Sequence, residues 1–159
     1  MWQGGWSGLG EILPVEEEAS ISFGPLRIWI HGRQFPDSTD YWDGNWLLVK
    51  ARCVGDRSQV EAVGAILRLD ELRKWKEDLV GLHTTLRGEV SLPAIEPQLT
   101  VKISAPQNQS GALTCEVSLS SEPISENHSF RFFTDQSYLP GLVLQLSSVL
   151  REYPIKGTP

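Results

Sequence analysis

The chain has 159 residues, of which 40% are apolar and 21% charged, the composition of an ordinary globular protein of one-domain length. Its formal net charge is −6 and its isoelectric point lies near 5.0. A protein of this sign is repelled by phosphate backbones, which argues against direct binding to nucleic acid. The negative charge either maintains solubility or steers the chain toward a basic protein partner.

Neither a membrane span nor a secretory signal is recognisable. No apolar run approaches the ~20 residues that a membrane-spanning helix needs. Residues 1–6 lack the basic region and apolar block of a signal peptide. We therefore expect a cytoplasmic protein that makes no contact with a membrane. Cys53 and Cys115 lie far apart in strand-like patterns, which predicts two buried free thiols rather than a disulfide.

The N-terminal segment differs in composition from the remainder. Residues 1–20 hold four glycines, a proline and an acidic run, which predicts a loosely structured lead-in with a short edge strand at 11–15. The acidic run is either a solvated loop or a contact for a basic partner. A single domain over 21–159 follows.

Apolar and polar residues alternate along the first part of this domain, as they do in half-buried strands. The segments with this pattern are 26–31, 46–54 and 60–69. After Asp70 the apolar period changes to three or four residues, which predicts an amphipathic helix. Asp70 suits the N-cap of this helix, and Gly88 suits its end.

Four further strands and a second helix are predicted in the second part. The strands are expected at 89–92, 98–104, 113–119 and 129–133, and the helix at about 138–153. Ser137 would cap this helix, with Pro140 in its first turn, where proline is tolerated.

The order βββα-ββββα, with short loops between strands, predicts an α+β fold. We expect one curved antiparallel sheet of six or seven strands that carries two helices. The predicted core consists of Leu26, Ile28, Ile30, Leu47, Val49, Leu67, Leu72, Trp75, Leu79, Leu99, Val101, Leu113, Val117, Phe132, Leu142, Leu146 and Val149.

Motifs for catalysis, cofactors and metals are not found in the sequence. The three histidines are far apart, and none has the spacing of a metal site. No serine lies in a Gly-x-Ser-x-Gly elbow, and no glycine-rich loop has phosphate-binding spacing. We therefore predict no catalytic residue, no cofactor and no metal. Carboxylates such as Asp40, Asp43 and Glu96 stay open, because a catalytic pair must face one cleft.

Three aromatic side chains surround an Asp-Gly-Asn turn signal in residues 41–46. A buried aromatic ring hides roughly 150–250 Å² of surface, so the run is a candidate structural anchor. Gly44 would then allow a positive φ in a tight turn, and Asn45 would bond to nearby backbone. Exposed Trp and Tyr are also typical of binding hot spots, and the exposure of Trp42 decides between these roles. The candidate contact residues are Tyr41, Trp42, Asp43 and Asn45, together with Glu16, Glu17 and Glu18 of the acidic run.

The stretch 40–47, Asp-Tyr-Trp-Asp-Gly-Asn-Trp-Leu, resembles the WapI-type immunity proteins of bacteria. The order of elements, the stretches 69–72 and 95–99 and a last helix that ends at Tyr153-Pro154 extend this resemblance over roughly residues 20–154. The resemblance implies that the chain neutralises a cognate toxin by direct binding in the cytoplasm. The toxins of such systems are often nucleases. No catalytic residues follow from the family.

These observations leave three functional hypotheses. The first is a non-enzymatic binding protein of the toxin-immunity type with a basic toxin domain as its partner. The second is a small-ligand binding module that uses the concave face of the sheet. The third is an enzyme that uses carboxylates. The sequence does not determine the oligomeric state.

Overall fold

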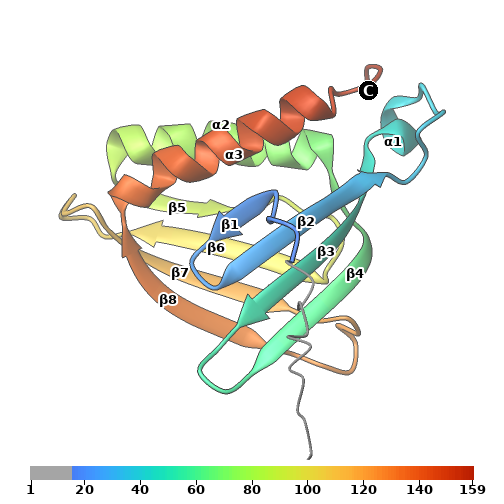
Figure 1. Ribbon diagram of the computed structural model, residues 1–159. Coiled ribbons are helices and arrows are strands. Elements are labelled where there is room, and N and C mark those ends of the chain that lie inside the picture. The colour runs from blue at the N-terminus through green and yellow to red at the C-terminus, as the bar shows by residue number, and fades with distance from the viewer. Residues whose placement is uncertain (1–15) are drawn as a thin grey trace, which may run out of the picture.

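Two four-stranded antiparallel sheets and three α-helices make up residues 16–159, the part of the chain that the computed structural model describes (Figure 1). Sheet A has the strand order β1 (Ile21–Phe23), β2 (Leu26–Arg33), β3 (Trp46–Val54) and β4 (Gln59–Arg68). Sheet B has the order β5 (Gly88–Ser91), β6 (Leu99–Ala105), β7 (Ala112–Leu119) and β8 (Ser129–Asp135). The helices are α1 (Tyr41–Gly44), α2 (Leu69–Thr85) and α3 (Leu139–Glu152), and a 3₁₀ turn, η1 (Gln136–Tyr138), precedes α3.

The α+β class is confirmed, but the predicted single curved sheet of six or seven strands is wrong. All seven predicted strands exist, and β1 is an additional one of three residues, too short to show a period. The strands divide into two sheets, because no ladder joins β4 to β5. Alternation along a strand shows which side chains are buried and leaves open which neighbour accepts its hydrogen bonds. The predicted edge strand at 11–15 lies outside the described residues.

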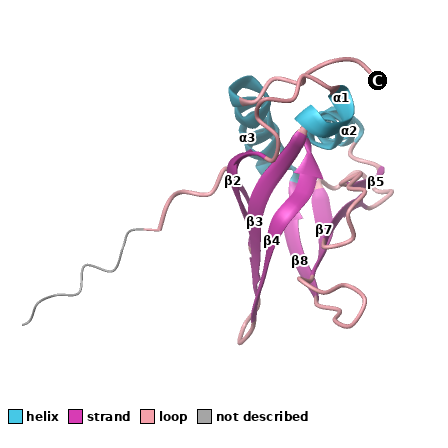
Figure 2. Ribbon diagram, turned by 90° about the vertical axis from the view of Figure 1, so that its right-hand side faces the viewer, coloured by secondary structure: helices cyan, strands magenta, loops and turns pink. Residues whose placement is uncertain are grey.

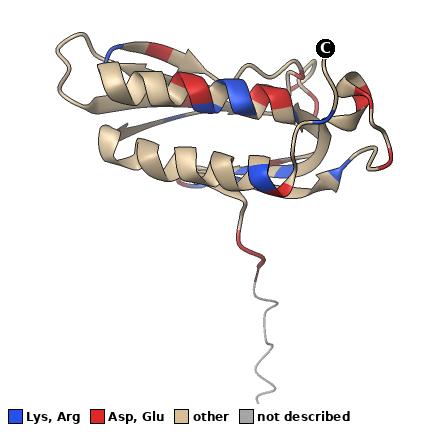
Figure 3. Cartoon of the chain, turned by 90° about the horizontal axis from the view of Figure 1, so that it is seen from above, with Lys and Arg blue, Asp and Glu red and all other residues tan. Residues whose placement is uncertain are grey.

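The two sheets face each other, and α2 and α3 lie side by side across one end of the space between them (Figures 1, 2 and 3). The inner faces of both sheets and the apolar stripes of both helices share one hydrophobic core. Trp75 of α2 is fully buried in this core. Of the predicted core residues, all are buried except Ile30 and Phe132, which are partly buried and pack against the core.

Phe132 of β8 packs against the β1–β2 hairpin of the other sheet. Its ring meets that of Phe23 edge-on at a centroid distance of 5.4 Å. It also covers Gly24 in the β1–β2 turn, where φ is +55° and a Cβ atom would lie 2.4 Å from the Phe132 ring. Glycine is therefore required at this turn both for its backbone conformation and for the close approach of β8.

The two long helices occur close to their predicted positions, but their caps differ. Helix α2 begins at Leu69, and its N-cap residue is Arg68 rather than Asp70. The Glu71 carboxylate accepts a hydrogen bond from the Arg68 backbone N–H at 2.9 Å, so the glutamate three residues on caps the helix. The C-cap residue of α2 is Leu86, which has the left-handed conformation and lies two residues before Gly88.

Helix α3 has Pro140 in its first turn, as predicted. Ser137 lies in the preceding 3₁₀ turn, where Asp135 accepts a hydrogen bond from its backbone N–H at 2.8 Å. None of the helices in residues 16–159 is long and apolar enough to cross a membrane.

Candidate partner-binding site around Trp42

The segment that joins β2 to β3 forms a corner beyond the ends of these strands and contains α1 (Figure 1). Asp40 caps this single helical turn, since its Oδ1 accepts hydrogen bonds from the backbone N–H groups of Trp42 at 2.8 Å and Asp43 at 3.0 Å. The Asp40 cap is the local reason that residues 41–44 form a helical turn.

The predicted tight turn with a positive φ at Gly44 is wrong. Gly44 ends α1 and is buried. A Cβ atom at this position would lie 3.0 Å from the Ser38 carbonyl oxygen and 3.3 Å from Lys156 Cδ. A side chain at this position is disfavoured first by the Ser38 backbone of the same corner and then by Lys156, and the conformational freedom of glycine is not used.

Asn45 joins the corner to the C-terminal segment through its buried side chain. Its Nδ2 donates to the carbonyl oxygens of Tyr41 at 2.8 Å and Lys156 at 3.0 Å. Its Oδ1 accepts from the Lys156 backbone N–H at 2.9 Å. Asn45 thus bonds to nearby backbone, as predicted, and also to residues 111 positions away in the sequence.

Arg68 holds the aromatic rings of the corner together. This buried guanidinium lies opposite Trp46 in the β3–β4 ladder. Its Cζ is 5.4 Å from the Tyr41 ring centroid, 5.3 Å from that of Trp42 and 5.4 Å from that of Trp46. Nη2 donates to the Tyr41 carbonyl oxygen at 3.1 Å, and Nε lies 3.1 Å from Asp70 Oδ1. Each desolvated cation–π contact of this kind contributes up to about 2 kcal/mol.

Sequence analysis missed Arg68, although a signal was present. Arg68 ends the β4 alternation close to the level where Trp46 begins β3, and a count from the hairpin loop brings the two within one residue of each other. A bulge between Leu47 and Leu48 shifts that register by one residue, which a count from the hairpin loop does not anticipate.

Trp42 is 56% exposed, although its ring is fixed in place. Tyr41 meets it edge-on at a centroid distance of 5.1 Å and is itself buried. Arg68 contacts it from the protein side. By the criterion stated above, exposure favours the contact role for Trp42, while Tyr41 and Asn45 serve as the structural anchor.

The exposed charges of the corner are acidic. Asp37, Asp40 and Asp43 are all exposed. The cations nearby are turned toward backbone carbonyls: Arg33 donates to Gly44 at 2.7 Å and to Pro154, and Lys156 Nζ donates to Pro36 at 2.7 Å and Ser38 at 2.8 Å. Figure 3 shows the carboxylate-bearing segments at this end of the molecule. Phe35, 46% exposed, adds a second apolar side chain.

The acidic run lies elsewhere. Glu16 contacts Arg52, which is six residues along β3 from Trp46, or roughly 20 Å at ~3.3 Å per residue. The structure therefore brings Tyr41, Trp42, Asp43 and Asn45 together and places Glu16, Glu17 and Glu18 on the outer face of sheet A.

A catalytic arrangement is not visible among the candidate carboxylates. Asp40 is engaged as a helix cap, and Asp43 is exposed beside it. In the part of the chain that the structure describes, no group of three or more His, Cys, Asp or Glu side chains is placed to hold a metal ion. The inner faces of both sheets are filled by the core, so the concave face proposed for a small ligand is occupied by apolar side chains.

Comparison with known proteins identifies one family. Residues 19–154 match the model of the Immunity protein WapI-like family, which is most of the chain and contains the whole Trp42 corner. No curated protein matches the chain.

Proposed function

Because the chain belongs to the Immunity protein WapI-like family, we propose that it is a non-enzymatic protein that neutralises a cognate bacterial toxin by binding to it directly. The proposed contact centre is Trp42. Family membership supports the toxin-neutralising role, and the corner described above supports the location.

The exposure of a fixed Trp42 ring is the observation that carries the location. A large aromatic side chain that is already ordered loses little conformational entropy on binding, which is why Trp and Tyr dominate binding hot spots. Arg68 and Tyr41 supply this order from the buried side. Tyr41 and Asn45 act in the proposed site as supports, and Trp42 and Asp43 as the contacting residues.

The acidic surface around Trp42 favours a basic toxin domain. Asp37, Asp40 and Asp43 face solvent, while Arg33 and Lys156 are bonded to the backbone. Opposite charge raises the rate of association and excludes acidic competitors. Nucleases hold phosphate groups and tend to be basic, so a nuclease toxin fits this surface best.

The acidic run provides a second contact in this proposal. Glu17 and Glu18 are exposed on the outer face of sheet A. A standard interface buries about 800 Å² on each partner, enough to extend over the roughly 20 Å between the two acidic regions. The run would add long-range attraction rather than a buried hot spot.

The test is to measure binding of the toxin domain encoded beside this gene to the wild-type chain and to Trp42→Ala. We expect the substitution to raise Kd roughly thirtyfold, which corresponds to about 2 kcal/mol for a central hot spot. Replacing both Asp37 and Asp43 by Asn should lower the association rate several-fold at low salt and change the dissociation rate little.

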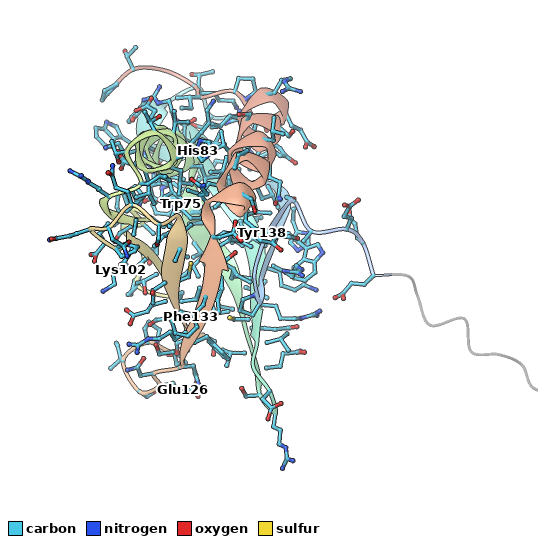
Figure 4. The ribbon with its side chains drawn as sticks, turned by 90° about the vertical axis from the view of Figure 1, so that its left-hand side faces the viewer. Trp75, His83, Lys102, Glu126, Phe133 and Tyr138 are labelled. Atoms are coloured by element: carbon cyan, nitrogen blue, oxygen red, sulfur yellow. The ribbon has the colours of Figure 1, made fainter. Side chains whose placement is uncertain are left out.

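Tyr138→Ala is the matched control. Tyr138 is 62% exposed at the end of the molecule opposite α1 (Figures 1 and 4). Its loss should leave Kd unchanged. Equal affinities of Trp42→Ala and Tyr138→Ala would show that Trp42 is not the contact centre. A Kd of the wild-type chain weaker than micromolar would exclude this toxin as the partner.

A further inference from the structure

The outer face of sheet A carries a second surface of opposite charge to the Trp42 corner. Trp29 of β2 points to this face, between two cations of β3. Lys50 Nζ lies 4.4 Å from the Trp29 ring centroid and Arg52 Cζ lies 4.9 Å from it. We call Arg27, Trp29, Lys50 and Arg52 the cationic–aromatic site.

An acidic segment of the same chain already occupies this site. The Glu16 carboxylate lies 2.7 Å from Arg52 Nη1 and 3.7 Å from Lys50 Nζ. The Trp29 indole N–H donates to the Glu17 carbonyl oxygen at 2.7 Å. Under this cover Trp29 is only 6% exposed. The site therefore recognises one carboxylate and the main-chain carbonyl of the next residue.

The segment is attached at few points. Beyond the contacts of Glu16 and Glu17, the hydroxyl of Ser20 accepts from the Ile30 backbone N–H at 3.1 Å. The side chains of Glu17 and Glu18 make no ion pair with the described residues. A cavity of about 430 Å³ is left beside the segment, lined on the protein side by Arg27, Trp29 and Arg52. A partly exposed ion pair of the Glu16–Arg52 kind changes an equilibrium by no more than about fivefold, so the segment can be displaced.

We propose that the cationic–aromatic site binds an acidic, extended segment of a partner protein, and that residues 16–18 occupy this site until such a segment displaces them. Charge complementarity selects the partner: the site offers Lys50, Arg52 and an indole N–H donor, which match a carboxylate next to a free main-chain carbonyl. Arg52 is also paired through Nε with Glu61 at 2.6 Å, so its Nη1 is the atom left for the carboxylate of the bound segment. This site contains no residue of the Trp42 corner, although residues 16–18 also form the second toxin contact proposed above, and its partner is acidic where the proposed toxin is basic.

Residues 16–18 lower the apparent affinity of the site for a partner segment, because they compete with it for the same contacts. A tethered segment competes at an effective concentration in the millimolar range. Weakening its hold should therefore strengthen binding of the same sequence added in trans. In Glu16→Gln the carboxylate that contacts Arg52 is lost, while the remainder of the site is intact.

The experiment titrates the acetylated and amidated peptide Glu-Glu-Glu-Ala-Ser into the full chain. The readout is the indole N–H resonance of Trp29, assigned by its loss in Trp29→Phe. We expect Glu16→Gln to bind this peptide severalfold more tightly than the wild type, up to about fivefold. The Gln-Gln-Gln-Ala-Ser peptide should not bind, and Lys50→Gln combined with Glu16→Gln should abolish the gain. Glu122→Gln, at an exposed glutamate that makes no ion pair within residues 16–159, is the matched control.

Equal peptide affinities of the wild type, Glu16→Gln and Glu122→Gln would overturn the proposal, because the segment would then be no competitor. Binding of the glutamine peptide as tightly as the glutamate peptide would overturn it too, since charge would not select the ligand. A dimer of the wild type that Glu16→Gln dissociates in sedimentation would assign the site to a second copy of the chain instead of an acidic partner.

Discussion

The side-chain amide of Gln145 pairs with the backbone of Ser22 as a strand would. The Ser22 N–H donates to Gln145 Oε1 at 2.5 Å, and Gln145 Nε2 donates to the Ser22 carbonyl oxygen at 3.3 Å. Ser22 lies in β1, the edge strand of sheet A, and Gln145 comes from α3. An open edge with free N–H and C=O groups is a template for unwanted pairing, and Gln145 covers it.

Replacing Gln145 by Ala should lower the free energy of unfolding by about 1–2 kcal/mol, because two backbone groups lose their partner. For a chain of this length the melting temperature should fall by roughly 2–4 °C per kcal/mol. Hydrogen exchange at the Ser22 amide should accelerate. Ser148→Ala is the control, since its hydroxyl bonds only within α3. Similar melting temperatures for both variants would show that the amide pair contributes nothing.

Asn45→Ala should be among the most destabilising substitutions at a polar position, with a loss of about 3 kcal/mol. The change removes three hydrogen bonds: the partly buried backbone N–H and C=O of Lys156 lose their partners, and the Tyr41 carbonyl oxygen keeps only Arg68 as a donor. Asn45→Asp should not rescue stability, because a carboxylate cannot donate to those carbonyls. Asn127, which is exposed, supplies the control, and Asn127→Ala should stay within about 0.5 kcal/mol of the wild type in urea unfolding. An Asn45→Ala variant as stable as Asn127→Ala would refute the anchor role.

Stability should depend on pH through Glu71. Burial raises the pKa of this carboxyl above its ordinary value, against the opposing effect of the Ile95 and Arg68 backbone N–H groups. A raised pKa means that the folded state binds the proton more tightly than the unfolded state does. The free energy of unfolding should therefore decrease as pH rises from the ordinary glutamate pKa through the raised value.

The measurement compares urea unfolding of the wild type and Glu71→Gln between pH 4 and pH 7. Glu71→Gln should lack this pH-dependent loss, because its amide does not ionise in this range. Glu77→Gln, at an exposed position of the same helix, should follow the wild type at every pH. Parallel curves for the wild type and Glu71→Gln would contradict the assignment.

Neither cysteine should react with a thiol reagent in the folded protein. Both are buried free thiols. Burial raises the pKa of Cys53 to about 11 and that of Cys115 to about 12, so the reactive thiolate is scarce at neutral pH. Ellman's reagent should therefore detect no thiol in native buffer and both in denaturant. Rapid labelling of either cysteine without denaturant would mean that its own sheet, sheet A for Cys53 or sheet B for Cys115, opens locally far more often than the burial of the thiol implies.

The elements that a local pattern specifies were predicted well, and the relations between them were not. Alternation located β3 and β4, and the three-to-four-residue period located α2. The division into two sheets depends on hydrogen bonds between strands, which no local pattern encodes. Helix α1 has a single turn held by one Asp40 cap, too short for a period to appear.

The candidate site divides in the same way. Composition alone indicated that residues 41–46 were an anchor or a contact. Tyr41 and Asn45 are buried anchors, Trp42 is exposed, and its contact role stays a prediction. The ring of Trp42 contacts Arg68, which is 26 positions further along the chain (68 − 42), so its environment does not follow from the local sequence. The Glu16–Arg52 contact likewise joins the segment before β1 to β3, which is two strands further along sheet A.

The bond between Asn45 and Lys156 has a kinetic consequence. It closes a loop of 111 residues, and the entropy of so long a closure must be overcome before the bond returns any free energy. Contacts of high sequence separation of this kind slow folding and form late. The Trp42 corner should therefore be completed only when both sheets and α3 are already assembled. A partner that binds Trp42 would then bind only the fully folded domain. Partly folded chains would lack the corner and would not compete for the partner.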